Sequence, residues 1–121
     1  MNLPIPDMSG WTMLDFELAF DGVRNVNEST LWLRNQPRAS AERSNVYYGG
    51  AAFIVDLGER WCGSVMTSVI DALEARRFPD AQDEDRRLRL LLHYYTQWGP
   101  AGYPLPELLA MLERWRAPIA A

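Results

Sequence analysis

Cysteine and histidine are the residues of this chain best suited to catalysis at neutral pH, and each occurs once, as Cys62 and His93. A thiolate with a histidine base would form a nucleophilic pair, and a helix N-terminus beside the thiol would lower its pKa. Cys62 precedes a predicted helix, but His93 lies among leucines within another one, and free cysteines are usually buried. We therefore expect Cys62 to be a core residue.

Two carboxylates, Asp15 and Glu17, are the other residues whose spacing could support hydrolysis, because paired carboxylates can act as acid and base. They are two residues apart, so in a strand they would share one face. That face would be opposite Phe16 and Phe20 and in contact with solvent. We therefore expect the chain to have no catalytic residue.

Metal and cofactor sites have little support in the sequence. A zinc site needs three or four cysteine, histidine or carboxylate ligands. The acidic run from Asp83 to Asp85 lacks the alternating spacing and the glycine of a calcium loop. The glycine-rich motifs that bind nucleotide phosphates do not occur either. We expect neither a metal nor a cofactor.

Length and composition indicate one globular domain that spans residues 1–121. The chain is 48% hydrophobic and contains five tryptophans, which is unlike a disordered segment. Its net charge of −4 and pI near 4.9 argue against binding to nucleic acid. A single cysteine and the absence of a long apolar run favour a cytoplasmic protein that does not bind membranes.

The first half of the chain predicts β-strands. Apolar and other residues alternate over the seven residues from Leu14 to Phe20, which predicts a half-buried strand over residues about 12–20, and Asp21 and Gly22 favour a tight turn after it. A helix over residues 11–21 stays open as the alternative, because apolar residues there also recur at helical spacing.

Two further strands are expected at residues about 29–34 and 46–57. Both segments are rich in apolar, aromatic and β-branched residues. Gly49 and Gly50 in the second of them would form either a bulge within one strand or a hairpin turn between two.

The second half predicts three helices, over residues about 64–78, 83–98 and 105–116. Apolar residues recur there at spacings of three and four, acidic residues open the middle helix, and Pro106 opens the last. Strands followed by helices predict an α+β fold, in which the three C-terminal helices pack on a small antiparallel sheet.

Arginine supplies all of the basic side chains, because the chain contains no lysine. Three arginines lie in or beside the polar segment after the second strand: Arg34, Arg38 and Arg43. They are close in sequence to Tyr47 and Tyr48. Arginine and tyrosine are enriched at protein interfaces, so this loop is one candidate partner-binding surface.

Two other surfaces are candidates. Trp98 and Tyr103 bracket a turn rich in glycine and proline, where an aromatic ring would be exposed. On the expected strand face, Asp15, Glu17 and Asp21 would meet a basic partner, which the negative net charge favours.

These observations together predict a non-enzymatic protein-binding protein. A small, acidic domain without catalytic groups is typical of a bacterial immunity protein or inhibitor that occludes a toxin or another protein target. A secretion or assembly chaperone for a protein partner is the first alternative, and a small enzyme that uses Cys62 or carboxylates is the second. A homodimer is compatible with the sequence.

Overall fold

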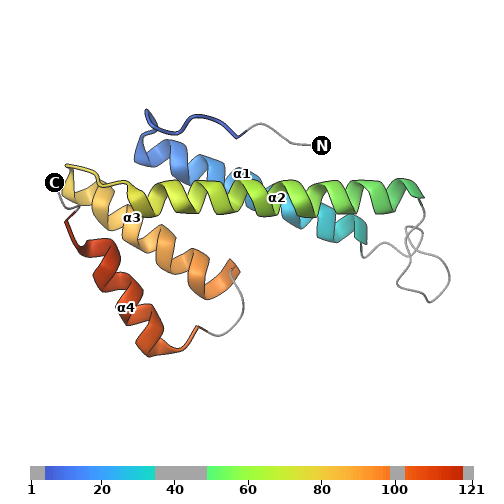
Figure 1. The fold of residues 1–121 in the computed structure, drawn as a ribbon. Helices are drawn as coiled ribbons and strands as arrows, with labels where there is room; N and C mark the ends of the chain where they lie inside the picture. Colours follow the sequence, from blue (N-terminus) through green and yellow to red (C-terminus); the bar gives the residue numbers. More distant parts are fainter. Residues whose placement is uncertain (1–4, 35–48, 99–102, 119–121) are drawn as a thin grey trace. The chain divides into compact units, whose positions relative to one another are not determined.

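The computed structural model describes residues 5–34, 49–98 and 103–118, and in these residues all regular secondary structure is helical, without a strand (Figure 1). The four helices are α1 (Met13–Arg34), α2 (Gly49–Ala75), α3 (Ala81–His93) and α4 (Leu105–Arg116). A π-helical turn, Tyr94–Trp98, follows directly after α3. The described part of the protein is therefore an all-α fold, and the prediction of an α+β fold is wrong.

The first two expected strands both lie within α1. Residues 12–20 and 29–34 fall in this single helix, apart from residue 12, and Asp21 and Gly22 continue the helix instead of forming a turn. The alternative of a helix over residues 11–21 is the correct one. The observed helix also continues well beyond residue 21, to Arg34.

The burial of α1 explains why the alternation was misleading. Phe16 and Phe20 are each 1% exposed, whereas Leu14 and Leu18 are 54% and 60% exposed. A strand would have placed all four side chains on one face. In a helix, residues four apart share a face and residues two apart do not, so the phenylalanines and the leucines separate.

The third expected strand is also helical. Of residues 46–57, those from Gly49 onwards belong to α2, and residues 46–48 lie outside the described part of the chain. Gly49 and Gly50 are the first two residues of the helix, so they form neither a bulge nor a hairpin turn.

The helix expected over residues 64–78 is the C-terminal part of α2. Ser64, where this helix was expected to begin, lies inside α2, and its carbonyl accepts a 3.0 Å hydrogen bond from the Ser68 hydroxyl. The helix ends at Ala75, three residues before Phe78.

The last two helices agree well with the sequence. α4 has the predicted limits, with Pro106 in its first turn. α3 begins at Ala81, two residues earlier than predicted, because the Asp80 side chain accepts hydrogen bonds from the backbone N–H groups of Gln82 and Asp83. The predicted helix over residues 83–98 is confirmed across α3 and the π-helical turn.

The chain divides into two compact units, and both α1 and α2 contribute to each of them. The first unit comprises Met1–Asp7 and Leu18–Val69, and the second comprises Met8–Glu17 and Ile70–Ala121.

The first unit contains an antiparallel pair of helices. The Cys62 thiol of α2 donates to the Val23 carbonyl of α1 at 3.7 Å, and Gly58 lies against the Thr30 side chain. Because the later residue of α1 meets the earlier residue of α2, the two segments run in opposite directions. Val23, Thr30 and Cys62 are all buried.

The second unit is organised around the end of α2, α3 and α4. Leu73, Leu91 and Trp115, one from each of these helices, are at most 1% exposed. At the start of α1, Phe16 packs edge to face on Phe78, with ring centroids 6.3 Å apart. These apolar contacts hold α3, α4, the end of α2 and the start of α1 together within the second unit.

Candidate binding surfaces

Asp15 and Glu17 do not form a carboxylate pair. Asp15 caps α1, where its carboxylate accepts from the Thr12 backbone N–H at 2.8 Å while its own N–H donates to the Thr12 hydroxyl at 3.2 Å. Glu17 forms an ion pair with Arg86 of α3, including a 3.2 Å hydrogen bond from the arginine Nε. Both carboxylates are therefore used within the second unit.

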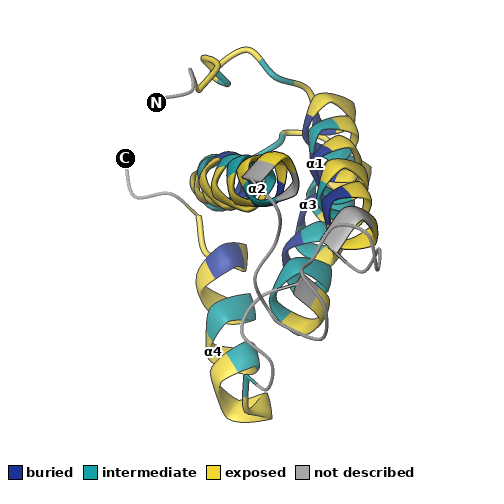
Figure 2. Ribbon diagram, turned by 90° about the vertical axis from the view of Figure 1, so that its right-hand side faces the viewer, coloured by how far each residue is buried: buried dark blue, intermediate teal, exposed yellow. Residues whose placement is uncertain are grey.

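Asp21 is exposed on the outer face of α1, by which we mean Leu18, Asp21, Asn25, Glu28 and Trp32 in the first unit. These residues follow one another at spacings of three and four and so share one side of the helix. All are exposed, and Leu18 and Trp32 at the two ends are 60% and 64% exposed. Figure 2 shows the corresponding exposed flank along α1.

Several predicted site residues lie wholly or partly outside the described residues. Arg34 is the last residue of α1 and Trp98 the last of the π-helical turn, and their side chains are not described. The remaining four, Arg38, Arg43, Tyr47 and Tyr48, lie outside the described ranges altogether.

Tyr103 belongs to an aromatic cluster of the second unit. It is half-buried and packs edge to face on Tyr95, which stacks on Trp115 with ring centroids 5.3 Å apart. The Tyr95 hydroxyl donates to the Glu74 carboxylate. Burial, together with this hydrogen bond, raises the pKa of Tyr95 far above its usual value. The cluster covers Trp115 and has a structural role.

Arg87 is a buried charged residue of α3 that was not predicted as a site from the sequence. It is 0% exposed, and its guanidinium donates to the carbonyls of Leu73, Glu74 and Trp115 at 2.8 to 3.0 Å. It also forms an ion pair with the Glu84 carboxylate at 3.2 Å. Its position four residues before the buried Leu91 was the signal in the sequence, since residues at this spacing share a helix face.

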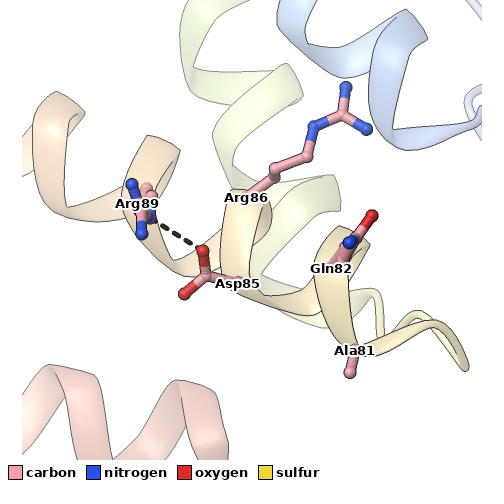
Figure 3. Close-up of a pocket in the computed structure, with 5 residues that line it drawn as sticks. All are labelled: Ala81, Gln82, Asp85, Arg86 and Arg89. Carbon is pink, nitrogen blue, oxygen red and sulfur yellow. Dashed lines mark ion pairs between the residues drawn. The ribbon is translucent and has the colours of Figure 1, made fainter.

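Among the described residues of the second unit, two hollows can be compared as candidate ligand sites. The larger, about 470 Å³, runs along α3 and is lined by Ala81, Gln82, Asp85, Arg86 and Arg89 (Figure 3). Arg89 pairs with Asp85 at 2.8 Å, and Arg86 extends in a different direction, toward its partners Glu17 and Asp83. Its cations are therefore already paired, which leaves this hollow poorly suited to an anionic ligand.

The second hollow, about 310 Å³, lies between the end of α2 and α4. It is lined by Asp71, Glu74, Ala75, Arg77, Arg114 and Trp115. The Arg77 guanidinium donates to the carbonyls of Glu74, Arg76 and Ala117 at 2.7 to 3.1 Å, so it serves the ends of the helices. Neither hollow is lined by a nucleophile beside a base.

Cys62 and His93 lie in different units, Cys62 within α2 and His93 at the end of α3. Cys62 is 2% exposed, and burial raises the pKa of its thiol. This environment is the opposite of the one that activates a cysteine.

Cys62 is expected to react slowly with a thiol reagent in the folded protein. With a disulfide reagent such as DTNB at pH 8, we expect a rate at least about 100-fold lower than in guanidinium, because both burial and the raised pKa reduce the accessible thiolate. Since the chain has one cysteine, the absorbance signal reports this residue alone. Equal rates in the folded and unfolded protein would contradict the buried placement.

Three or more cysteine, histidine or carboxylate side chains do not gather at a possible metal site anywhere in the described residues. Within the same residues, no helix combines the length and the apolar character that crossing a membrane requires.

Comparisons with known protein families, with curated proteins and with solved structures found no match to this chain.

Proposed function

We propose that this chain is a non-enzymatic protein-binding protein that acts by occluding another protein, as a bacterial immunity protein or inhibitor does. The observation that supports this proposal is the outer face of α1. It exposes 64% of Trp32 and 60% of Leu18. Tryptophan is on average highly buried in folded proteins, and at interfaces it is among the residues that contribute most to binding.

The chemistry of the described residues supports binding over catalysis. The thiol is buried with a raised pKa, and the carboxylates once considered as a pair are occupied in a helix cap and an ion pair. An activated nucleophile is the group that the enzyme alternative would need. A binding protein needs none, only an accessible surface of suitable shape and charge.

The test is capture of a partner, followed by an assay of that partner's own activity. The full chain is immobilised and used to capture proteins from the cytosol of its source organism, in parallel with Trp32→Ala and Phe53→Ala. Phe53 is a matched control because it is an exposed aromatic residue of the same unit, on α2. The captured partner is then purified and titrated with each form of the chain.

We expect the wild-type chain to abolish the partner's activity at a one-to-one ratio. Trp32→Ala should require a concentration about 30-fold higher, as for an interface residue that contributes about 2 kcal/mol, and Phe53→Ala should resemble the wild type. A partner that stays fully active when saturated would contradict occlusion and favour the chaperone alternative. Equal inhibition by Trp32→Ala would contradict the outer face of α1 as the binding surface.

A further inference from the structure

The outer face of α1 has a specific order of side chains along the helix axis. Leu18 and Trp32 are the apolar ends, about 21 Å apart for fourteen residues of α-helix, and Asp21 and Glu28 lie between them. The two carboxylates are seven residues apart, so they lie on the same side of the helix, separated by two turns. The face therefore presents an apolar, acidic, acidic, apolar pattern.

Within the described residues, neither of these two carboxylates belongs to an ion pair, in contrast to several other acidic side chains. Asp56 in the same unit pairs with Arg60, and Asp85 pairs with Arg89. Asp21 and Glu28 are exposed, whereas the neighbouring cation on α1, Arg24, is half-buried. The solvent-facing side of α1 thus carries negative charge between two apolar anchors.

This arrangement constrains what can cover the face. Covering Leu18 and Trp32 would also take Asp21 and Glu28 out of water, which costs several kcal/mol for an ionised carboxylate without a cationic partner. A second copy of the chain would bring two more carboxylates to the same place and add like-charge repulsion. A partner that supplies cations between its own apolar residues avoids both costs.

We propose that the outer face of α1 binds a basic amphipathic helix of the partner protein. Its apolar residues contact Leu18 and Trp32, and its lysine or arginine side chains lie opposite Asp21 and Glu28. Helix pairs of this kind match an apolar stripe with an apolar stripe, and charges at the edges set orientation and specificity. The inference rests on the proposed function and adds the chemistry of the partner to it.

The probes are two synthetic helical peptides of 21 residues with leucine at the same heptad positions. One carries lysine and arginine at the flanking positions, and the other carries glutamate. Binding to the full chain is measured by calorimetry at low and at physiological salt. The variants are Trp32→Ala and the double variant Asp21→Asn/Glu28→Gln. The matched control is Glu107→Gln/Glu113→Gln, which removes two exposed carboxylates from α4.

We expect the basic peptide to bind at least about tenfold more tightly than the acidic peptide, with a preference that weakens as salt rises. Asp21→Asn/Glu28→Gln should weaken the basic peptide about fivefold, as expected for two exposed ion pairs, and leave the acidic peptide unweakened. Trp32→Ala should weaken the basic peptide by at least about tenfold. The α4 control should stay within about twofold of the wild type.

Three outcomes would overturn the inference. Equal affinity for both peptides would remove the charge preference, although the proposed function would survive if Trp32 still mattered. An equal loss in the α4 control would show attraction by overall charge instead of binding at α1. A dimer in analytical ultracentrifugation that Trp32→Ala dissociates would identify a second copy as the occupant. Failure of the proposed function is seen separately, in the activity of the captured partner.

Discussion

Replacing Arg87 by leucine is expected to lower the free energy of unfolding by about 3–5 kcal/mol, a large part of the stability of a domain of this size. The guanidinium has no exposed surface, and it donates to the Leu73, Glu74 and Trp115 carbonyls and to the Glu84 carboxylate. Leucine would fill part of the space but would remove all of these hydrogen bonds at once. Of the three carbonyls, only those of Leu73 and Glu74 would keep a second donor of those observed, the Arg76 N–H and the Arg77 guanidinium.

The acceptors explain why the residue is an arginine. Leu73 and Glu74 lie in the last turn of α2, and Trp115 lies in the last turn of α4, where backbone carbonyls have no partner within their own helix. One planar guanidinium with several N–H groups can serve both helix ends at once. Lysine has a single ammonium group, so Arg87→Lys should recover only part of the lost stability.

The measurement is urea unfolding followed by circular dichroism, with Arg89→Leu as the matched control. Arg89 is on the same helix two residues later, but its side chain is 78% exposed and pairs with Asp85 on the surface. Its loss should cost less than about 1 kcal/mol. If Arg87→Leu does not fold, Arg87→Lys provides the measurable variant. A change below about 1 kcal/mol for Arg87→Leu would contradict its role in joining the helix ends.

The C-terminal half of the fold could be predicted because its helices carry local signals at their ends. Acidic residues at the start of α3 and Pro106 at the start of α4 act through the first turn of each helix, and both helices were found close to the predicted positions. Such signals depend on neighbouring residues alone, so the sequence contains them in full.

Strands were predicted in the N-terminal half, where the structure has helices, because the sequence segments that were compared with each pattern were too short. Seven residues with alternating polarity fit a strand, but the buried Phe16, Phe20 and Val23 continue at spacings of four and three, which only a helix satisfies. A window that extended to the buried Thr30 would have favoured α1 over two strands. No local signal separates the two periods within a segment as short as residues 12–20.

The candidate surface could be predicted only in part. Asp21 was identified as an exposed acid on the wrong element, and Trp32 was placed inside a strand. The exposure of Trp32 depends on the rotation of α1 about its axis, which the buried Phe20 and Val23 determine. The partners of Arg87 include backbone carbonyls of distant segments. Every residue has a backbone carbonyl, so the sequence does not show which ones will accept a hydrogen bond from an arginine.

Gly58→Ala is expected to destabilise the first unit by about 1–3 kcal/mol, although alanine is the better helix former. A Cβ at Gly58 would lie 2.4 Å from the Thr30 Oγ1 and 3.0 Å from its Cγ2. Thr30 cannot easily move away, since it is buried, is branched at Cβ and donates a 3.0 Å hydrogen bond to the Val26 carbonyl.

Gly63→Ala on the same helix gives the matched control, because a Cβ there would have no neighbour within 4 Å. With no contact to oppose helix propensity, this substitution should raise the free energy of unfolding by about 0.5–1 kcal/mol. The two glycine variants should therefore differ in sign, as measured by denaturant unfolding. If Gly58→Ala stabilised the protein as much as Gly63→Ala, the close approach of α1 and α2 at Thr30 would be contradicted.

A double-mutant cycle tests whether Thr30 is the cause. Thr30→Ala removes both atoms nearest to the new Cβ and leaves the residue's own Cβ at 3.2 Å. In that background Gly58→Ala should cost less than it does alone, by about 1 kcal/mol or more. If Gly58→Ala lowered the free energy of unfolding equally in both backgrounds, a contact other than the one with Thr30 would be the cause. A positive coupling would locate the closest approach of the helix pair at these two residues, whose contact sets the register of α1 against α2.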